Sequence, residues 1–273
     1  MAVTTRPTPK RLILSLLSAP TMENVEIAYF IEWGRLFDIE AAATRVAVGR
    51  LVKQGFIESV ARGTYSIGPQ GRLMAETASS WMEAEQRVRP WSGGWILVHS
   101  SHLGRTNKTA LRARERAFRL NGFAELVAGL WCRPDNFREP PSATRDRLLS
   151  LGLEDDAVVM EVRDLPGRSA KQLHELWPRK RLESGYREFT RLLQLSTARV
   201  RKMEQGDAAR ETFLVGEAVI RQINADPLLP DEMIDATARR EMISAMVAYN
   251  ELGSNAWSSF RRADPGCIDS DRA

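Results

Sequence analysis

Few residues in this sequence have the types and spacing that catalysis or metal binding requires. His99 and His102 lie three positions apart, but no cysteine or suitably spaced carboxylate accompanies them, so they make a poor metal site. His174 falls in an expected helix, where packing or hydrogen bonding is the simpler interpretation. The sequence has no glycine-rich phosphate loop, no Gly-x-Ser-x-Gly motif and no paired Cys-x-x-Cys. We therefore expect a binding protein and not an enzyme, with no metal and no cofactor.

The residues that stand out instead are cations on one expected helix, which runs from after Asp38 to residue 54. Asp38 is a plausible N-cap, and Gly55 is well placed just past the end of the helix. Helical periodicity predicts a buried stripe on one face, made of Thr44, Ala47, Val48 and Leu51. The opposite face gathers small and basic residues, namely Ala42, Arg45, Val46, Gly49, Arg50 and Lys53.

The elements around this helix predict how it is presented. Two further helices are expected before it, at about residues 11–18 and 23–33. Residues 56–60 and 64–67 follow it as two short strands, joined by Ala61-Arg62-Gly63 with a glycine where a positive φ is convenient. Three helices and a hairpin, in this order, predict a winged helix-turn-helix.

Such a unit binds DNA because an α-helix fits the major groove. Ala42 and Gly49 permit close approach, and the arginines supply donors for base edges or phosphates. Arg62, at the hairpin tip, is placed to touch phosphate or the minor groove. An ordinary solvated helix face is the alternative interpretation of the same cations. The predicted contacts with double-stranded DNA are Ala42, Arg45, Val46, Gly49, Arg50, Lys53 and Arg62.

Charge is unevenly distributed along the chain. The net charge is +4; residues 1–86 carry 9 basic and 9 acidic groups, residues 87–147 carry 12 and 5, and residues 148–273 carry 18 and 21. The central excess includes a row of cations with helical spacing: Lys108, Arg112, Arg116 and Arg119. This row can be a solvated face, a second DNA contact or a site for an anionic effector.

The rest of the sequence predicts two further domains. Strands are expected at residues 95–99, 123–132 (one strand or two) and 157–162, with a helix at about residues 108–121, which fits a ferredoxin-like α+β sandwich. From about residue 169 the chain is expected to be helical, with helices at about 208–225 and from 231 onward. We therefore predict an α+β, mainly helical fold with a winged helix-turn-helix domain (1–88), a ferredoxin-like middle domain (89–168) and a helical C-terminal domain (169–273).

Composition limits where the protein works. At 273 residues, with 43% apolar and 27% charged residues, the sequence describes a globular chain with no apolar run long enough to span a membrane. The two cysteines, Cys132 and Cys267, cannot form a disulfide framework or a thiolate zinc cluster. We expect a cytoplasmic protein that does not bind membranes.

Several motifs together resemble the PaaX family of repressors of phenylacetate degradation. The residues Thr44-Arg45-Val46-Ala47-Val48-Gly49-Arg50-Leu51 match the recognition-helix pattern of that family. The resemblance also rests on motifs spread over nearly the whole chain: Arg89-Pro90-Trp91-Ser92-Gly93-Gly94-Trp95, Leu111-Arg112, Gly122-Phe123, Gly129-Leu130-Trp131-Cys132-Arg133-Pro134, Leu176-Trp177, Tyr186, Phe189 and Asp226-Pro227-Leu228-Leu229-Pro230.

The resemblance implies a homodimeric transcriptional repressor that leaves its operator when an aryl acyl-CoA thioester binds. It also implies a middle domain similar to the small nuclease subunit of CRISPR adaptation. That subunit holds a metal with an aspartate after its first strand, where this chain has His99-Ser100. The family usually continues from the Asp-Pro-Leu-Leu-Pro segment to a Trp-Pro-Gly turn, whereas this chain has Asp235-Ala236-Thr237 in that region, so another aromatic acid is an alternative effector.

Three functions remain open at this point. The first is a repressor with an aromatic or acyl-CoA effector, the second a metal-dependent nucleic-acid-processing enzyme built on the middle domain, and the third an effector-free nucleic-acid-binding scaffold. We expect the first. Its effector would be bound by aromatic and basic side chains, for which the candidates are Trp95, Arg112, Arg116, Trp131, Trp177 and Arg221.

Overall fold

The computed structural model of this chain describes residues 6–18, 24–165 and 170–263. Within these residues the protein is α+β and mainly helical, with two small antiparallel sheets, as the sequence predicts. Among the described helices, none is both long and apolar enough to cross a membrane.

The chain divides into two compact units, and each contains segments that are distant in sequence. The first consists of residues 1–80, 192–218 and 246–273, and the second of residues 81–191 and 219–245. The long helices that contribute residues to both units are α8 (Arg179–Val200), α9 (Gln205–Asn224) and α10 (Ala236–Ala263). The domain boundaries expected at residues 88 and 168 stay predictions.

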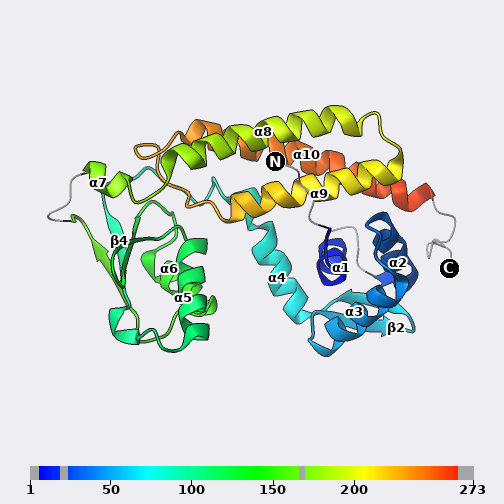
Figure 1. The fold of residues 1–273 in the computed structure, drawn as a ribbon, viewed down its shortest axis with the longest axis horizontal. Helices are drawn as coiled ribbons and strands as arrows, with labels where there is room; N and C mark the ends of the chain where they lie inside the picture. Colours follow the sequence, from blue (N-terminus) through cyan, green and yellow to red (C-terminus); the bar gives the residue numbers. More distant parts are fainter. Residues whose placement is uncertain (1–5, 19–23, 166–169, 264–273) are drawn as a thin grey trace. The chain divides into compact units, whose positions relative to one another are not determined.

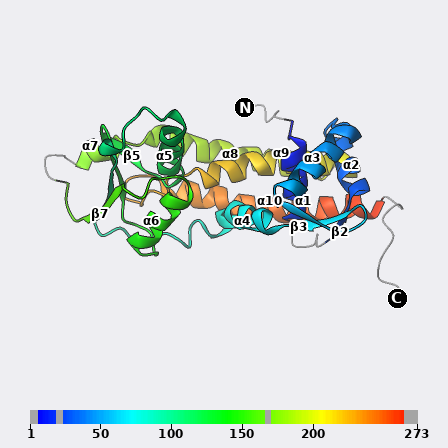
Figure 2. The same ribbon diagram turned by 90° about the horizontal axis from the view of Figure 1, so that it is seen from below.

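The first unit begins with short helices and a small sheet of strand order β1-β3-β2. Figures 1 and 2 show the β2–β3 hairpin beside α3. The elements in chain order are α1 (Pro9–Leu17), β1 (Val25–Glu26), α2 (Ile27–Leu36), α3 (Ala41–Lys53), β2 (Ile57–Ala61), β3 (Thr64–Ile67) and α4 (Pro69–Ser79). The 3-10 turn η1 (Ser80–Glu83) follows at the boundary, and its residues from Trp81 onward belong to the second unit.

The second expected helix begins later than the sequence pattern predicts. The pattern placed Val25 in that helix, but Val25 and Glu26 form β1 and pair with Tyr65 and Thr64 of β3. The amide of Ile27 then donates to the carbonyl of Gly63 at 2.9 Å. Val25 is buried in either arrangement, so hydrophobic periodicity alone could not distinguish a helix start from a two-residue strand.

Aromatic side chains hold the amino-terminal helices against α9 and α10 within the first unit. Trp33 is fully buried and makes edge contacts with Trp257 and Phe260, with ring centroids 5.2 Å and 5.4 Å apart. Phe37 lies 5.1 Å from Phe213 of α9. Such ring pairs contribute roughly 0.5–1.5 kcal/mol each beyond the burial of their area. The helices that carry α3 are therefore anchored by residues from far along the chain.

The second unit contains a four-stranded antiparallel sheet of strand order β5-β6-β4-β7. Ile96 and Val98 of β4 pack with Phe118 of α5 and Leu148 of α6, which places both helices on one face of the sheet. The elements in chain order are β4 (Trp95–His99), the 3-10 turn η2 (Ser101–Leu103), α5 (Lys108–Leu120), β5 (Ala124–Val127), β6 (Leu130–Pro134), α6 (Pro141–Ser150), β7 (Val158–Val162) and α7 (Ala170–His174).

Three details of the later chain differ from expectation or refine it. The apolar run at 123–132 forms two strands, because Gly129, at φ +75°, turns the chain between them. The sequence did not predict α6. The last helix begins at Ala236 and not at Asp231, because Asp235 accepts a hydrogen bond from the Ala238 amide at 3.3 Å and caps the helix there.

Candidate nucleic-acid interface

Helix α3 is held in place by its inward face. Thr44, Val48 and Leu51 are buried, and the predicted stripe is confirmed except that Ala47 is only half-buried. Gly34 lies in the last turn of α2, so close to α3 that a side-chain β-carbon there would be 3.1 Å from Thr44 Oγ1. The missing side chain at Gly34 lets α2 and α3 pack closely at this point, while the opposite face of α3 stays exposed.

The ends of α3 are set by backbone geometry. Gly55, at φ +70°, terminates the helix as predicted, and its amide donates to the carbonyl of Val52 while the amide of Phe56 donates to that of Leu51. The predicted N-cap was wrong. Asp38 lies in the preceding turn at φ +55°, and the helix begins at Ala41 after Glu40, whose side chain forms no capping bond.

The outward face of α3 is exposed along its whole length. A β-carbon added at Gly49 would have no heavy atom of the described residues within 4 Å, so this glycine is not packed against another described helix. Val46 is 53% exposed, an unusual position for a branched apolar side chain. The exposed residues of this face include every α3 position that the sequence predicted: Ala42, Arg45, Val46, Gly49, Arg50 and Lys53.

The hairpin presents a second exposed feature beside α3. Gly63, at φ +81°, forms the turn, and Arg62 is exposed at the tip as predicted. The register shifts between Ser59 and Ala61, which indicates a bulge at Val60, and Val60 is 52% exposed. The sequence did not predict the bulge at Val60 or the exposure of this side chain, because one extra residue leaves no recognisable pattern in so short a strand.

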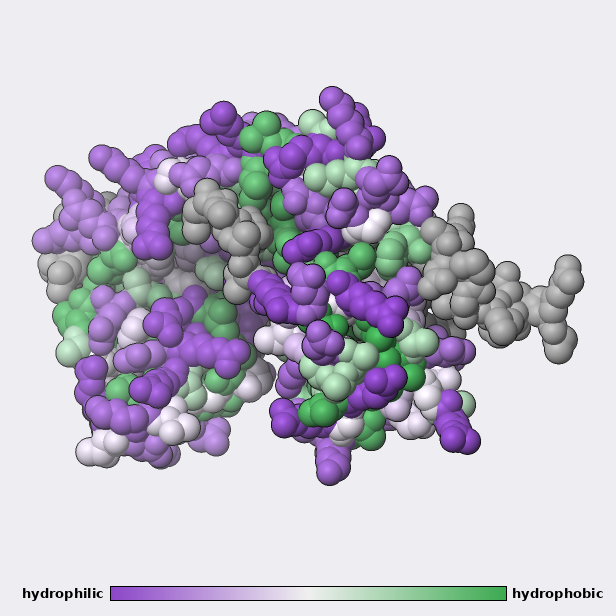
Figure 3. Space-filling model, turned by 45° about the vertical axis from the view of Figure 1, so that its right-hand side comes forward, coloured by the Kyte–Doolittle hydropathy of each residue, from purple (hydrophilic) through white to green (hydrophobic). Residues whose placement is uncertain are grey.

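Acidic groups close to this surface limit its electrostatic attraction for phosphates. Glu40 precedes α3 and Glu58 lies on β2, and both are exposed. On the face drawn in Figure 3, hydrophilic residues dominate and hydrophobic ones lie between them, as is usual for a protein surface. The favourable features of α3 are therefore shape and donor placement, more than a strong local positive charge.

The candidate effector residues do not form one pocket. Trp95 and Trp177 are buried and stack with ring centroids 6.3 Å apart, and Trp177 Nε1 donates to the carbonyl of Gly122 at 3.1 Å. Trp131 pairs with Val98 in the sheet and stacks on Phe118 at 4.7 Å, so it lies on the opposite face from Trp95. These rings pack the core of the second unit. The remaining candidates are the exposed arginines Arg112 and Arg116 of α5 and Arg221 of α9.

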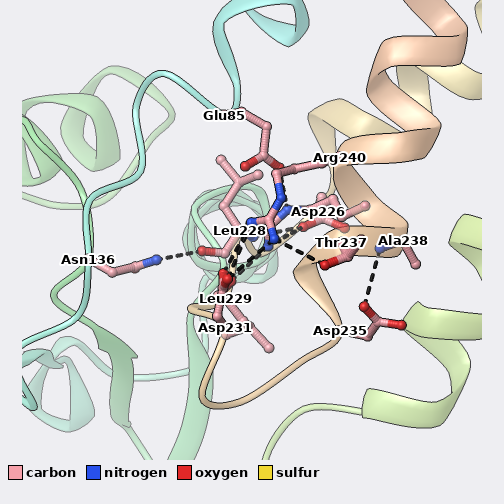
Figure 4. A network of polar contacts seen from close by, with 11 residues as sticks. Glu85, Asn136, Asp226, Leu228, Leu229, Asp231, Asp235, Thr237, Ala238 and Arg240 are labelled. Carbon is pink, nitrogen blue, oxygen red and sulfur yellow. Dashed lines mark hydrogen bonds and ion pairs between the residues drawn. The ribbon is translucent and has the colours of Figure 1, made fainter.

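A buried polar network in the second unit surrounds the segment from Asp226 to Pro230 (Figure 4). Asp226 Oδ1 accepts from the Leu228 amide at 2.8 Å. Arg239, which is fully buried, donates to the carbonyl of Leu229 and to Glu85, both at 2.7 Å. Asn136 Nδ2 donates to the carbonyl of Leu228 at 2.7 Å. The network explains why this irregular segment is ordered, and no spacing in the sequence links its distant members.

Burial shifts the acid–base behaviour of this network. The pKa of Asp226 is raised, chiefly by burial and despite the nearby Arg239. The pKa of Tyr186 is raised by burial and by the charge of Asp226. These side chains support the fold of the second unit, and we assign them no catalytic role.

Little in the described residues resembles a metal or thiol site. They contain no group of three or more histidine, cysteine, aspartate or glutamate residues that could hold a metal ion. His99 Nε2 lies 2.6 Å from Ser101 Oγ, and His102 Nε2 lies 2.8 Å from the carbonyl oxygen of Asp156. Burial raises the pKa of the Cys132 thiol to about 12, whereas Cys267 lies outside the described residues.

Comparison with known proteins gives a structural relationship alone. No protein-family model matches the sequence, and no curated protein does. The fold is similar to that of the uncharacterized protein Rv0674 from Mycobacterium tuberculosis, with a TM-score of 0.61 and 20% sequence identity. The similarity covers 93% of this chain and 100% of that one. At this level of identity the similarity concerns the fold and not the function.

Proposed function

We propose that this protein is a sequence-specific, DNA-binding transcriptional repressor of the PaaX type, and that α3 is its recognition helix. The observation that carries the proposal is the outward face of α3, which is exposed, basic and free of bulk at Gly49, next to an exposed hairpin. The chain order helix, strand, helix, helix, strand, strand, with sheet order β1-β3-β2, supports a winged helix-turn-helix.

The exposed arginines and Val46 of α3 match chemical groups of the major groove. Arginine side chains donate in pairs to the O6 and N7 acceptors of guanine, and an apolar side chain such as Val46 packs on the methyl group of thymine. Arg62, at the hairpin tip, would contact the phosphate backbone of the DNA. Such a contact orients the protein on the duplex but does not distinguish one base sequence from another. Because the first 86 residues carry equal numbers of acidic and basic groups, a single copy would bind weakly, and we propose a homodimer that contacts two half-sites.

The order of elements and strands in the second unit also supports the proposal of a ferredoxin-like domain. Its elements from β4 to β7 follow the order strand, helix, strand, strand, helix, strand, with an antiparallel sheet of order β5-β6-β4-β7. We propose that this domain and the carboxy-terminal helices respond to a catabolic intermediate, an aromatic acid or its acyl-CoA thioester. Repression would then end because the effector binds the DNA-incompetent form of the dimer more tightly.

Selection of binding sites from random duplex DNA, followed by titration of variants, tests the proposal. Arg45→Ala and Arg50→Ala should each weaken the selected duplex by about 1–3 kcal/mol, and shuffled DNA by much less, because guanine contacts exist only in the right sequence. Arg201→Ala is the matched control, since Arg201 is exposed and follows α8. Equal losses on both duplexes would show that the arginines touch only phosphate, and failure to select any sequence would refute specific recognition.

The effector requires a separate titration. Adding aromatic acids and their acyl-CoA thioesters to the complex should lower the affinity for the selected duplex by about 1–3 kcal/mol with the right ligand. Affinity that stays the same with every compound would leave a DNA-binding protein without an effector. That result would leave the recognition of DNA by α3 intact.

A further inference from the structure

One face of α5 carries a row of cations that the fold itself does not use. We call it the α5 row, and it consists of Lys108, Arg112, Arg116 and Arg119. Spacings of four, four and three residues place these side chains on one side of the helix. All are exposed, and within the described residues none forms an ion pair or a side-chain hydrogen bond.

Several other arginines in this part of the chain have partners. Arg114 of the same helix is buried and donates to both carboxylate oxygens of Glu154, at 3.0 Å and 2.5 Å. Arg89 donates to Asp135 at 2.8 Å, and Arg147 forms an ion pair with Glu139. The buried and half-buried arginines named here thus have partners within the fold, whereas the exposed α5 row, like the exposed Arg105 and Arg138, has no side-chain partner within the described residues.

The α5 row is also unfavourable for an isolated helix. Like charges three or four residues apart repel, and Lys108 lies at the amino-terminal end, where the helix dipole disfavours a cation. Glu115 is the one carboxylate on α5, and no ion pair joins it to Arg112 or Arg119 within the described residues. Anions from outside the chain would remove this repulsion.

The geometry indicates the kind of anion. A compact anion is held by donors that converge on one point, whereas these side chains are spread along a helix for roughly 16 Å, at 1.5 Å per residue. Duplex DNA presents phosphates about every 3.4 Å along each strand, so an extended row of cations can meet several of them. Residues 87–147 carry 12 basic and 5 acidic groups, whereas residues 1–86, which include α3, carry 9 of each.

We propose that the α5 row is a second DNA contact, which binds the phosphate backbone of duplex DNA independently of base sequence. This inference rests on the proposed DNA-binding function and assigns the nonspecific part of the affinity to α5. Helix α3 would then choose the sequence, while α5 would supply charge neutralisation that the amino-terminal segment lacks.

The salt dependence of binding tests this division of roles in the full-length protein. The double variant R112Q/R116Q keeps polar helix formers and removes two cations. We expect the negative slope of log K against log salt concentration to decrease in magnitude by about 1.8, since each neutralised phosphate contributes about 0.9 to that magnitude. Affinity for the selected duplex and for a shuffled duplex should fall by the same factor, so that the ratio between them stays unchanged.

The matched control is K180Q/R181Q, which removes two exposed cations near the start of α8 with the same change in net charge. The control should keep the slope of the unsubstituted protein, and circular dichroism should be the same for all three proteins. An unchanged slope in R112Q/R116Q, or an equal fall in both double variants, would overturn the α5 contact alone. If the unsubstituted protein binds no duplex, the proposed function fails and the α5 contact fails with it.

Discussion

At the scale of single residues, Gly49 is a position where the residue that would favour folding differs from the residue that would favour DNA binding. A glycine inside a helix lowers stability by about 1 kcal/mol relative to alanine. No neighbouring atom within the structure requires a glycine there, because a β-carbon would meet nothing within 4 Å. A requirement for close approach by DNA would explain why this cost is tolerated.

The variant Gly49→Ala tests that explanation. We expect its free energy of unfolding in urea to rise by about 1 kcal/mol, because alanine favours the helix. Its affinity for the selected duplex should fall, because the added methyl group keeps the backbone away from the base edges. Gly185→Ala is the matched control in α8, where a β-carbon also meets nothing within 4 Å. The control should gain stability without any change in DNA affinity, and the same behaviour in both variants would contradict the explanation.

Single residues also show which structural properties can be predicted from the sequence and which cannot. The exposure of Arg45, Arg50 and Arg62 follows from helical periodicity and from a turn signalled by glycine, and the structure agrees. Their contact with DNA stays a prediction. Trp95 and Trp131 are both large and aromatic, and on that basis the sequence predicts both as effector residues. The strand register places them on opposite faces of a sheet, and a sequence without known pairing does not reveal that.

At the scale of elements, local signals were sufficient where chain neighbours determine the structure. The helix at 41–53, the β2–β3 hairpin and the strands β4 and β7 all have strong periodicity or turn chemistry, and each was predicted. The two-residue strand β1 was missed, because it exists only through pairing with Tyr65 and Thr64, some 40 residues away. The N-cap expected at Asp38 was wrong: Asp38 lies in a turn between Phe37 and Ile39, which are both buried in the core of the first unit, and this burial depends on residues distant in sequence.

At the scale of the whole molecule, no local pattern could predict how distant segments combine. The first unit includes residues 192–218 and 246–273 because Phe213, Trp257 and Phe260 complete the core around Trp33 and Phe37. Apolar periodicity shows that these side chains are buried, but it does not show against which residues. The polar network around Asp226 could not be predicted from local patterns either, since its members Glu85 and Arg239 are 154 positions apart.

Stability as a function of pH should reveal two carboxylates with opposite behaviour, the buried Asp226 and the half-buried Glu154. The pKa of Asp226 is raised above its ordinary value of 3.8, first by burial. Its favourable contribution is complete below 3.8 and is lost as the pH rises through the folded-state pKa. The pKa of Glu154 is lowered below 4.5, first by its hydrogen bond from Arg114. Its contribution is present above 4.5 and is lost as the pH falls through the folded-state pKa.

The variants Asp226→Asn and Glu154→Gln test these two opposite pH dependences of stability. We expect the free energy of unfolding of Asp226→Asn, relative to the unsubstituted protein, to increase as the pH rises from 4 toward 7, because asparagine keeps the acceptor for the Leu228 amide and cannot ionise. Glu154→Gln should cost about 1–3 kcal/mol near neutrality, since it leaves the buried Arg114 without its carboxylate. This cost should stay constant above pH 4.5 and shrink as the pH falls below 4.5, where Glu154 of the unsubstituted protein becomes protonated. Urea unfolding at several pH values measures both. If the free energy of unfolding had the same pH dependence in both variants, the assigned directions would be wrong. A raised pKa and a lowered pKa change stability in opposite directions as the pH rises.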